Sequence, residues 1–148
     1  MQLSLPHDAL VVVCDARRAL FLRNEGDEVF PNLKVERHAE APELGSNAAT
    51  GMDRPGRTQN VVGPTSAVEA ADRQREAKVH FAEETIRTLE TLHRQMNPPG
   101  LVLVAPPRML AALRECLDDD IRATLLAEVD KDLTKHPVYE IERLLTKQ

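Results

Sequence analysis

The sequence predicts an α/β protein in which helices cover a mixed β-sheet. Residues 101–105 are five apolar residues in a row, a pattern typical of a strand that is buried on both faces. Two prolines follow, and leucines then recur three and four residues apart up to position 117, which predicts a short core-facing helix. Along the whole chain the order is strand, strand, strand, long loop, helix, strand, helix, strand, helix, which is typical of an α/β sheet.

Three strands are expected before the first helix, over residues 9–14, 19–23 and 33–40. The first is a continuous apolar run, and the short turn after it predicts that the second is its hairpin partner. The third alternates apolar and polar residues, which favours a position near the edge of the sheet. Four of its residues are expected to share one face: Leu33, Val35, Arg37 and Ala39.

A long helix is expected to run from a capping box at Ser66 and Glu69 to about Met96. Residues that step by three and four predict its buried stripe: Val79, Ala82, Ile86, Leu89, His93 and Met96. Some thirty residues of helix would span about 45 Å, which exceeds the size of such a domain. The first turns, around residues 73–75, are therefore expected either to project from the domain or to break.

The last third of the chain predicts one more strand and one more helix. Residues 122–130 fit a helix or a strand by pattern, and their place in the order favours a strand. A final helix is expected after His136, with four residues facing inward: Val138, Ile141, Leu144 and Leu145. The acidic run at residues 118–120 predicts a solvated turn rather than a metal site, because adjacent side chains rarely converge on one ion.

Composition places the protein among single-domain globular chains, with one domain over residues 1–148. A formal charge of −5 argues against a general nucleic-acid binder and leaves a local basic patch open. Cys14 and Cys116 lie in apolar contexts, which predicts buried free thiols and a reducing compartment. The first residues do not have the pattern of a signal peptide, and no apolar stretch approaches the roughly 20 residues that cross a bilayer. We therefore expect a cytoplasmic protein without membrane insertion.

Two segments are candidates for binding. Residues 41–65 are rich in glycine and proline, which predicts a long flexible loop. Within it, Arg54, Arg57 and Gln59 are candidates for contact with RNA phosphate or with a protein partner. Arg108 follows the strand at 101–105, at the end of a strand where open α/β sheets hold ligands, and is a candidate anion contact. The alternative for both segments is an ordinary solvated surface.

Four pieces of the sequence carry a family resemblance: ALVVVCDARRALFLRNEG, DRPGRT, LVLVAPPRMLAALRE and IRATLLAEVDKDLTKHPVYEIERLL. Through them the chain resembles the bacterial host-attachment protein family, whose members are described as required for attachment to host cells. That family is in turn similar to the middle domain of archaeal and eukaryotic peptide-chain release factors and of the ribosome-rescue factor Pelota. This resemblance implies a mixed sheet of ribonuclease-H-like type. The domain would begin with a strand, a turn that contains Asp15, and a second strand that contains Ala19, Leu20 and Phe21.

Release factors carry Gly-Gly-Gln in the loop before the main helix, where it promotes hydrolysis of peptidyl-tRNA. This chain has Gln59 but no Gly-Gly before it, so no catalytic residue is transferred from the resemblance. We therefore expect a non-enzymatic cytoplasmic interaction domain that associates with the ribosome or RNA and affects host attachment indirectly. No cofactor is expected.

Two alternatives remain open. The first is a hydrolase of peptidyl-tRNA or RNA, in which Gln59 positions water or Asp15 and a second carboxylate hold Mg²⁺. The second is a factor that acts directly in attachment at the cell surface.

Overall fold

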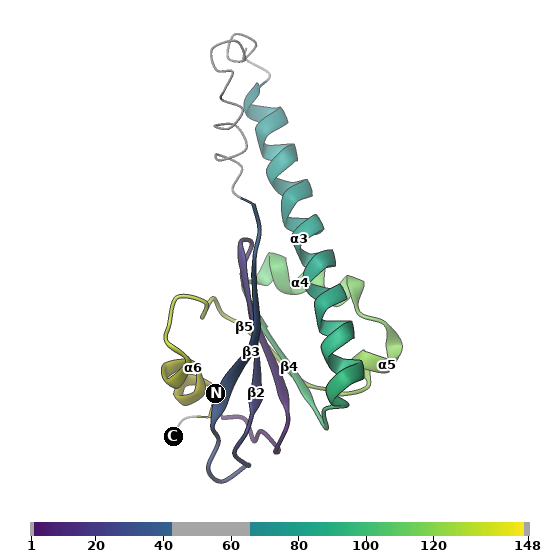
Figure 1. Ribbon diagram of the computed structural model, residues 1–148. Helices are drawn as coiled ribbons and strands as arrows, with labels where there is room; N and C mark the ends of the chain where they lie inside the picture. The colour runs from purple at the N-terminus through teal and green to yellow at the C-terminus, as the bar shows by residue number, and fades with distance from the viewer. Residues whose placement is uncertain (1, 43–65, 147–148) are drawn as a thin grey trace.

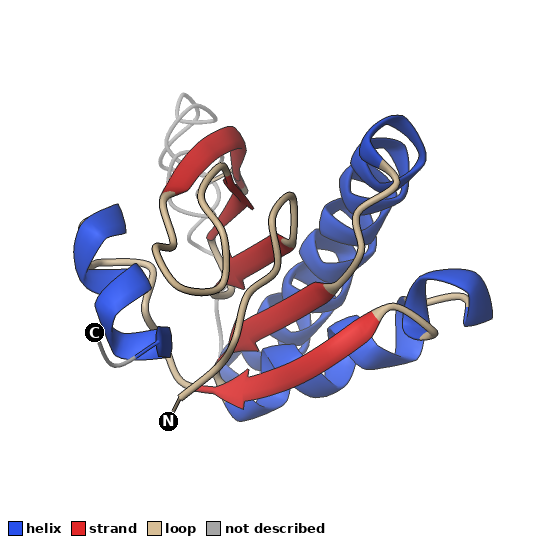
Figure 2. Ribbon diagram, turned by 90° about the horizontal axis from the view of Figure 1, so that it is seen from below, coloured by secondary structure: helices blue, strands red, loops and turns tan. Residues whose placement is uncertain are grey.

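A five-stranded mixed sheet forms the centre of the protein (Figures 1 and 2). In the computed structural model, which describes residues 2–42 and 66–146, the strand order is β3-β2-β1-β4-β5. The strands are β1 (Leu10–Cys14), β2 (Arg18–Asn24), β3 (Leu33–Glu40), β4 (Leu101–Ala105) and β5 (Leu125–Asp130). β2 is antiparallel to both neighbours, whereas β1, β4 and β5 are parallel. The predicted α/β class, the three early strands and the strand near residues 122–130 are confirmed.

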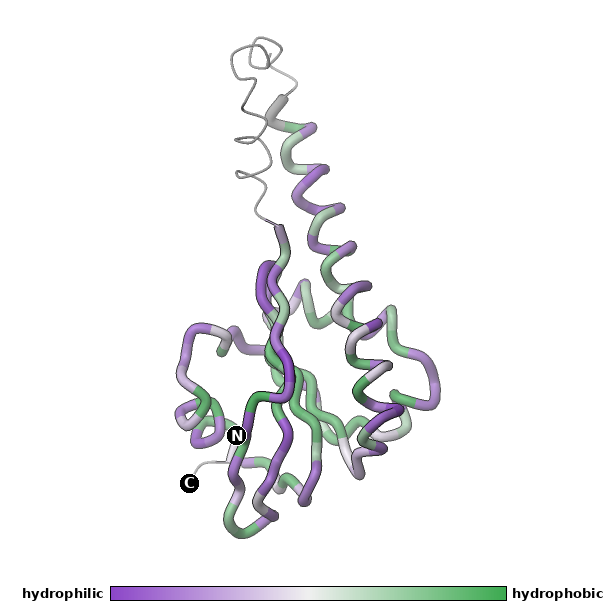
Figure 3. Tube along the Cα trace, viewed as in Figure 1, coloured by the Kyte–Doolittle hydropathy of each residue, from purple (hydrophilic) through white to green (hydrophobic). Residues whose placement is uncertain are grey.

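Helices cover both faces of this sheet (Figure 2). One face packs against α3 (Ser66–Met96), α4 (Pro107–Cys116) and the short α5 (Asp119–Arg122). The other face packs against α6 (Val138–Thr146) and the N-terminal segment around Leu5. Every residue of β1 and β4 is buried, as their continuous apolar runs predict. Figure 3 shows this apolar centre under polar outer elements.

The predicted facing of β3 is wrong beyond its first half. Val35 pairs with Leu22, whereas Arg37 pairs with Phe21, so a bulge interrupts the ladder between these pairs. Because Leu22 and Phe21 lie on opposite faces of the sheet, the bulge moves the later residues of β3 to the face opposite Val35. β3 is an edge strand, as predicted, and most of its residues are exposed.

The helix α3 has the predicted bounds and projects beyond the sheet without a break (Figure 1). Ala82, Ile86 and Leu89 are buried as predicted, but Val79 is 45% exposed. Its position lies before the part of α3 that packs on the sheet, which begins at Phe81. The periodicity correctly predicts which face of α3 turns inward. Val79 is not part of the core because the sheet does not extend beneath this part of the helix.

Three smaller predictions are wrong or only partly correct. Leu144 is 40% exposed instead of facing inward, whereas Ile141 and Leu145 are buried. The carboxylate of Asp118 accepts a hydrogen bond from the backbone N–H of Ile121, so the acidic run begins α5 rather than forming a plain turn. Cys116 is half-buried, and Cys14 is fully buried as expected.

Candidate functional site at the carboxyl edge of the sheet

The carboxyl ends of β1, β4 and β5 lie at one edge of the sheet, the upper edge in Figure 1. Open α/β sheets bind ligands outside the carboxyl ends of their strands. Three connections meet at this edge: the turn after β1, the step from β4 into α4, and residues 131–137 between β5 and α6. The polar and charged side chains at this edge are therefore the candidates for a functional site.

Asp15 organises the turn after β1. One carboxylate oxygen, Oδ1, accepts hydrogen bonds from the backbone N–H groups of Arg17 and Arg18, each at 2.7 Å. The other oxygen, Oδ2, accepts a hydrogen bond from Thr134 Oγ1 at 2.7 Å. Partial burial acts to raise the pKa of Asp15, but the bonds from Thr134 and from the two backbone N–H groups favour the ionised form and lower the pKa below its ordinary value.

Thr134 ties the connection after β5 to the turn after β1. Because β4 lies between β1 and β5, residues 131–137 must cross the carboxyl end of β4 to make this contact. Thr134 Oγ1 also lies 3.0 Å from Asp132 Oδ1, and the backbone N–H of Thr134 donates to the same oxygen at 3.3 Å. A hydroxyl has one proton, so the shorter contact makes Asp15 the principal acceptor. The edge is thus braced by hydrogen bonds.

This arrangement does not favour the use of Asp15 as a magnesium ligand. Protein donors already occupy both of its carboxylate oxygens. In the described part of the chain, no group of three or more His, Cys, Asp or Glu side chains is arranged to hold a metal ion. The geometry therefore assigns Asp15 a structural role.

Cys14, directly before Asp15, is not an activated nucleophile. Burial, and then the negative charge of Asp15, raise the pKa of its thiol to about 12, while the neighbouring Thr85 hydroxyl opposes the shift. The thiol donates to the backbone carbonyl of Asp15 at 3.2 Å. Thr85 Oγ1 is buried and has no hydrogen-bond partner among the described residues, so its contact with the thiol is not a well-formed hydrogen bond.

The same edge carries exposed basic side chains. Five basic residues lie in its connections or at its strand ends: Arg17, Arg18, Arg108, Lys131 and Lys135. They outnumber by one the carboxylates of Asp15, Glu40, Asp130 and Asp132. The connections and strand ends at the opposite, amino edge carry more carboxylates than cations. The seven carboxylates belong to Asp8, Glu25, Asp27, Glu28, Asp118, Asp119 and Asp120, and the three cations are Arg23, Lys34 and Arg122. The connections and strand ends of the carboxyl edge are therefore less acidic than those of the amino edge.

Only one of the predicted binding residues can be placed in the structure. Arg108 is exposed on the first turn of α4, directly after Pro106 and Pro107. Arg54, Arg57 and Gln59, together with most of the predicted loop at 41–65, lie outside the described residues. The described chain adds Lys131 and Lys135, which sequence reasoning missed. The signal was a run of charged residues directly after a strand, at the same edge as Arg108.

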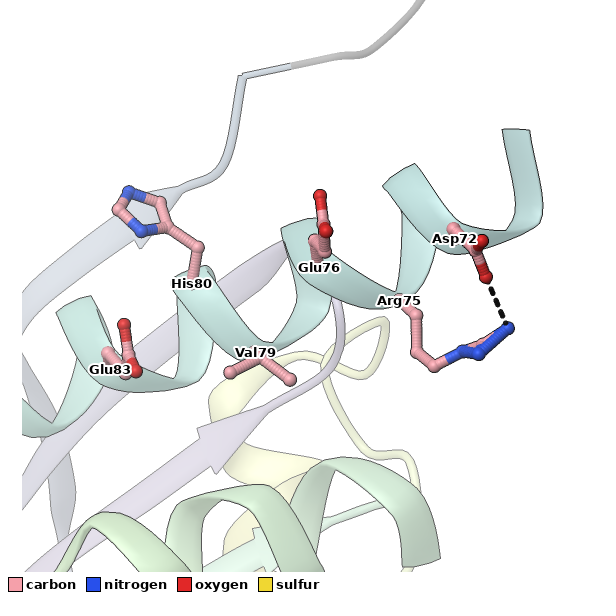
Figure 4. A pocket seen from close by; sticks show the side chains of 6 residues that line it. All are labelled: Asp72, Arg75, Glu76, Val79, His80 and Glu83. Carbon is pink, nitrogen blue, oxygen red and sulfur yellow. Dashed lines mark hydrogen bonds and ion pairs between the residues drawn. The ribbon is translucent and has the colours of Figure 1, made fainter. Parts of the chain in front are cut away.

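A shallow groove of about 570 Å³ lies along the projecting part of α3 (Figure 4). Its lining residues recur along one face of the helix: Asp72, Arg75, Glu76, Val79, His80 and Glu83. Asp72 pairs with Arg75 at 3.0 Å, and His80 pairs with Glu84 at 3.2 Å. Charges paired along one exposed helix are typical of a solvated surface. The lining residues that the structure describes form no catalytic arrangement.

Fold and site together define an α/β domain with a braced carboxyl edge that carries basic side chains. Within residues 2–42 and 66–146, no helix has the length and apolarity needed to cross a membrane.

The chain belongs to the family described as "Protein required for attachment to host cells", whose family model matches residues 10–145. The predicted family membership is thereby confirmed, and the similarity to release-factor middle domains stays a prediction. A search of curated proteins finds no match.

Proposed function

We propose that this protein is a non-enzymatic cytoplasmic interaction domain that binds RNA, including RNA on the ribosome, and thereby affects host attachment indirectly. The observation that carries the proposal is the set of exposed cations at the carboxyl edge. Within the described residues, the side chains of Arg108, Lys131 and Lys135 form no ion pair or hydrogen bond with another residue. Such cations are available to phosphate groups, which dominate the affinity of nucleic-acid binding.

The bracing of the edge supports this use. The bond between Thr134 and Asp15 fixes residues 131–137 across the end of β4, next to the step into α4. Lys131 and Lys135 are therefore held at the same edge as Arg108 instead of moving with an unattached loop. Arg54 and Arg57 lie outside the described residues, and they are candidate RNA contacts from the sequence alone.

Co-sedimentation with ribosomes, at low and moderate salt, tests the proposal. Wild-type protein is expected to sediment with ribosomes at low salt and less at moderate salt. A variant with Arg108→Ala, Lys131→Ala and Lys135→Ala is expected to bind several-fold more weakly, and Arg54→Ala with Arg57→Ala tests the remaining predicted residues. The matched control removes three exposed basic side chains elsewhere, with Lys34→Ala, Arg37→Ala and Arg94→Ala. Equal binding by the first variant and the control contradicts a role for the carboxyl edge, and no binding by the wild type contradicts the proposed function.

A further inference from the structure

The loop between β2 and β3 displays two large apolar side chains to solvent. Val29 is 67% exposed and Phe30 is 76% exposed, whereas the other two phenylalanines, Phe21 and Phe81, are buried. This loop, residues 25–32, lies at the amino edge of the sheet, the lower edge in Figure 1, and its apolar tip is visible in Figure 3. A singly exposed apolar residue is ordinary, but Val29 and Phe30 are adjacent and both exposed in one short loop.

The exposure of Phe30 does not come from a loose loop, because a buried asparagine organises residues 25–32. Asn24 has no exposed surface, and its Oδ1 accepts hydrogen bonds from the backbone N–H groups of Gly26 at 2.9 Å and Asn32 at 2.8 Å. Its Nδ2 donates to the carbonyl of Leu5 at 2.8 Å, with a longer contact to the carbonyl of Pro6 at 3.2 Å. One side chain thus joins both ends of the loop to the N-terminal segment.

Asp27 fixes the tip of the loop. Its Oδ1 accepts hydrogen bonds from the backbone N–H groups of Val29 at 2.9 Å and Phe30 at 2.7 Å. The carbonyl of Phe30 accepts from the backbone N–H of Asp27, and it lies only 2.0 Å from the position that a Cβ on Gly26 would occupy. Only glycine allows this close approach. The backbone at Phe30 is therefore held in place before any partner binds, which lowers the backbone entropy lost on binding.

The surroundings of Phe30 are acidic. Glu25, Asp27 and Glu28 are exposed, and residues 24–33 contain no lysine or arginine. Two cations flank the loop, Arg23 and Lys34. Arg23 is engaged by the carboxylates of Asp8 at 2.9 Å, Glu36 at 3.0 Å and Glu25 at 3.4 Å. The three carboxylates of the loop outnumber the exposed Lys34, so the charge around Phe30 is negative. An apolar anchor with an acidic rim is complementary to an apolar pocket with a cationic rim. Anionic lipid would repel the rim, and so would the same loop of a second copy.

We infer that residues 25–32 form a docking loop that inserts Phe30 into an apolar pocket bordered by lysine or arginine on a protein partner. This loop lies at the edge opposite to Arg108, Lys131 and Lys135, so the inference does not depend on RNA binding by the carboxyl edge. The two edges give the protein two separate faces with opposite charge preference.

The test begins with photo-crosslinking of the full-length chain in its native cells. The crosslinking analogue p-benzoylphenylalanine replaces Phe30 in one variant and Tyr139 in the control, since Tyr139 is an aromatic residue with 72% exposure on α6. We expect one protein to be crosslinked from position 30 and not from position 139. No crosslink from position 30, or a crosslink only to lipid, RNA or a second copy, would overturn the inference.

The crosslinked protein is then purified, and its affinity for the chain is measured by calorimetry. Phe30→Ser is expected to weaken binding at least about tenfold, as loss of a central aromatic anchor does. Glu28→Gln is expected to weaken it a few-fold, with a smaller dependence on salt, and Tyr139→Ser is the matched control with unchanged affinity. Both serine variants are expected to keep the wild-type unfolding midpoint, because both side chains are exposed. Binding that is indifferent to Phe30→Ser would overturn the inference, and ribosome co-sedimentation of the same variant reports separately on the proposed function.

Discussion

Thr134 Oγ1 donates a hydrogen bond to Asp15 Oδ2 at 2.7 Å, across 119 positions of sequence. This bond connects the turn after the first strand with the connection after the last strand. Between them lies the end of β4, so one short contact fixes the layout of the whole carboxyl edge. The proposed RNA surface depends on this layout, and the bond is accessible to direct experiment.

Thr134→Val is expected to destabilise the protein by about 1–2 kcal/mol at neutral pH, because it removes a donor from an ionised carboxylate. The partial exposure of Asp15 keeps the effect modest. Urea unfolding measures the change. Thr91→Val is the matched control, since the Thr91 hydroxyl bonds only to a carbonyl within α3, and a change below about 0.5 kcal/mol is expected there.

The same pair predicts a dependence on pH. The pKa of Asp15 is lowered in the folded protein from its ordinary value of 3.8. Its ionised form therefore adds stability above that value, and this contribution is lost as the pH falls through the folded pKa. The difference in the free energy of unfolding between wild type and Thr134→Val is expected to become smaller as the pH falls from neutral to about pH 3. A difference that stays constant over this range would show that Thr134 does not act through the charge of Asp15.

Cys14 is expected to resist alkylation in the folded protein. With a pKa of about 12, its thiolate is only roughly one ten-thousandth of the population at about pH 8. Cys116 is half-buried, and burial followed by the charge of Glu83 raises its pKa as well, so slow labelling is expected at Cys116 first. Mass spectrometry after iodoacetamide treatment is expected to show at most one modified cysteine in native buffer and both in concentrated urea. Rapid native labelling of Cys116→Ser would contradict the buried environment of Cys14.

Asn24→Ala is expected to cost about 2–3 kcal/mol, because it leaves the buried carbonyl of Leu5 and the partly buried N–H groups of Gly26 and Asn32 without partners. Asn32→Ala is the matched control: its side chain is exposed and forms no hydrogen bond with another described residue, so a change within about 0.5 kcal/mol is expected. Urea unfolding compares the two variants. Faster amide exchange at Val29 and Phe30 in Asn24→Ala would locate the loss in the loop, and equal stability of both variants would refute the role given to Asn24.

Leu103 tests the position of β4 at the centre of the core. Leu103→Ala is expected to destabilise the protein by about 3 kcal/mol, because the side chain is fully buried. Leu144→Ala removes the same atoms from a side chain that is 40% exposed, and less than about 1 kcal/mol is expected. Thermal unfolding compares the two, and similar losses would contradict the observed difference in burial.

The sequence predicts those features that depend on local pattern. β1 and β4 follow from continuous apolar runs, and the bounds of α3 follow from its periodicity and its flanking residues. The facing of β3 is not predictable in this way, because the bulge arises from its pairing with Phe21 and Leu22. The exposure of Val79 depends on where the sheet ends beneath α3.

The features of the candidate site likewise separate into those that local sequence predicts and those that depend on contacts between distant residues. The position of Arg108 at the carboxyl edge is predictable because only two prolines separate it from the end of β4. The contact of Thr134 with Asp15 is not, since neither residue belongs to a recognisable motif and the two meet only through the strand order. Phe30 was also missed, because an isolated phenylalanine in a turn gives no signal of exposure until its hydrogen-bonded loop is seen.

If cations at the carboxyl edge bind RNA phosphate as proposed, binding must weaken as the salt concentration rises. The affinity for single-stranded polyuridylate is measured by fluorescence anisotropy over a range of salt concentrations. For the variant with Arg108→Ala, Lys131→Ala and Lys135→Ala, the slope of log affinity against log salt is expected to fall by about two relative to wild type, whereas the control with Lys34→Ala, Arg37→Ala and Arg94→Ala keeps the wild-type slope. Equal slopes for both variants, or no binding by the wild type, would contradict the account.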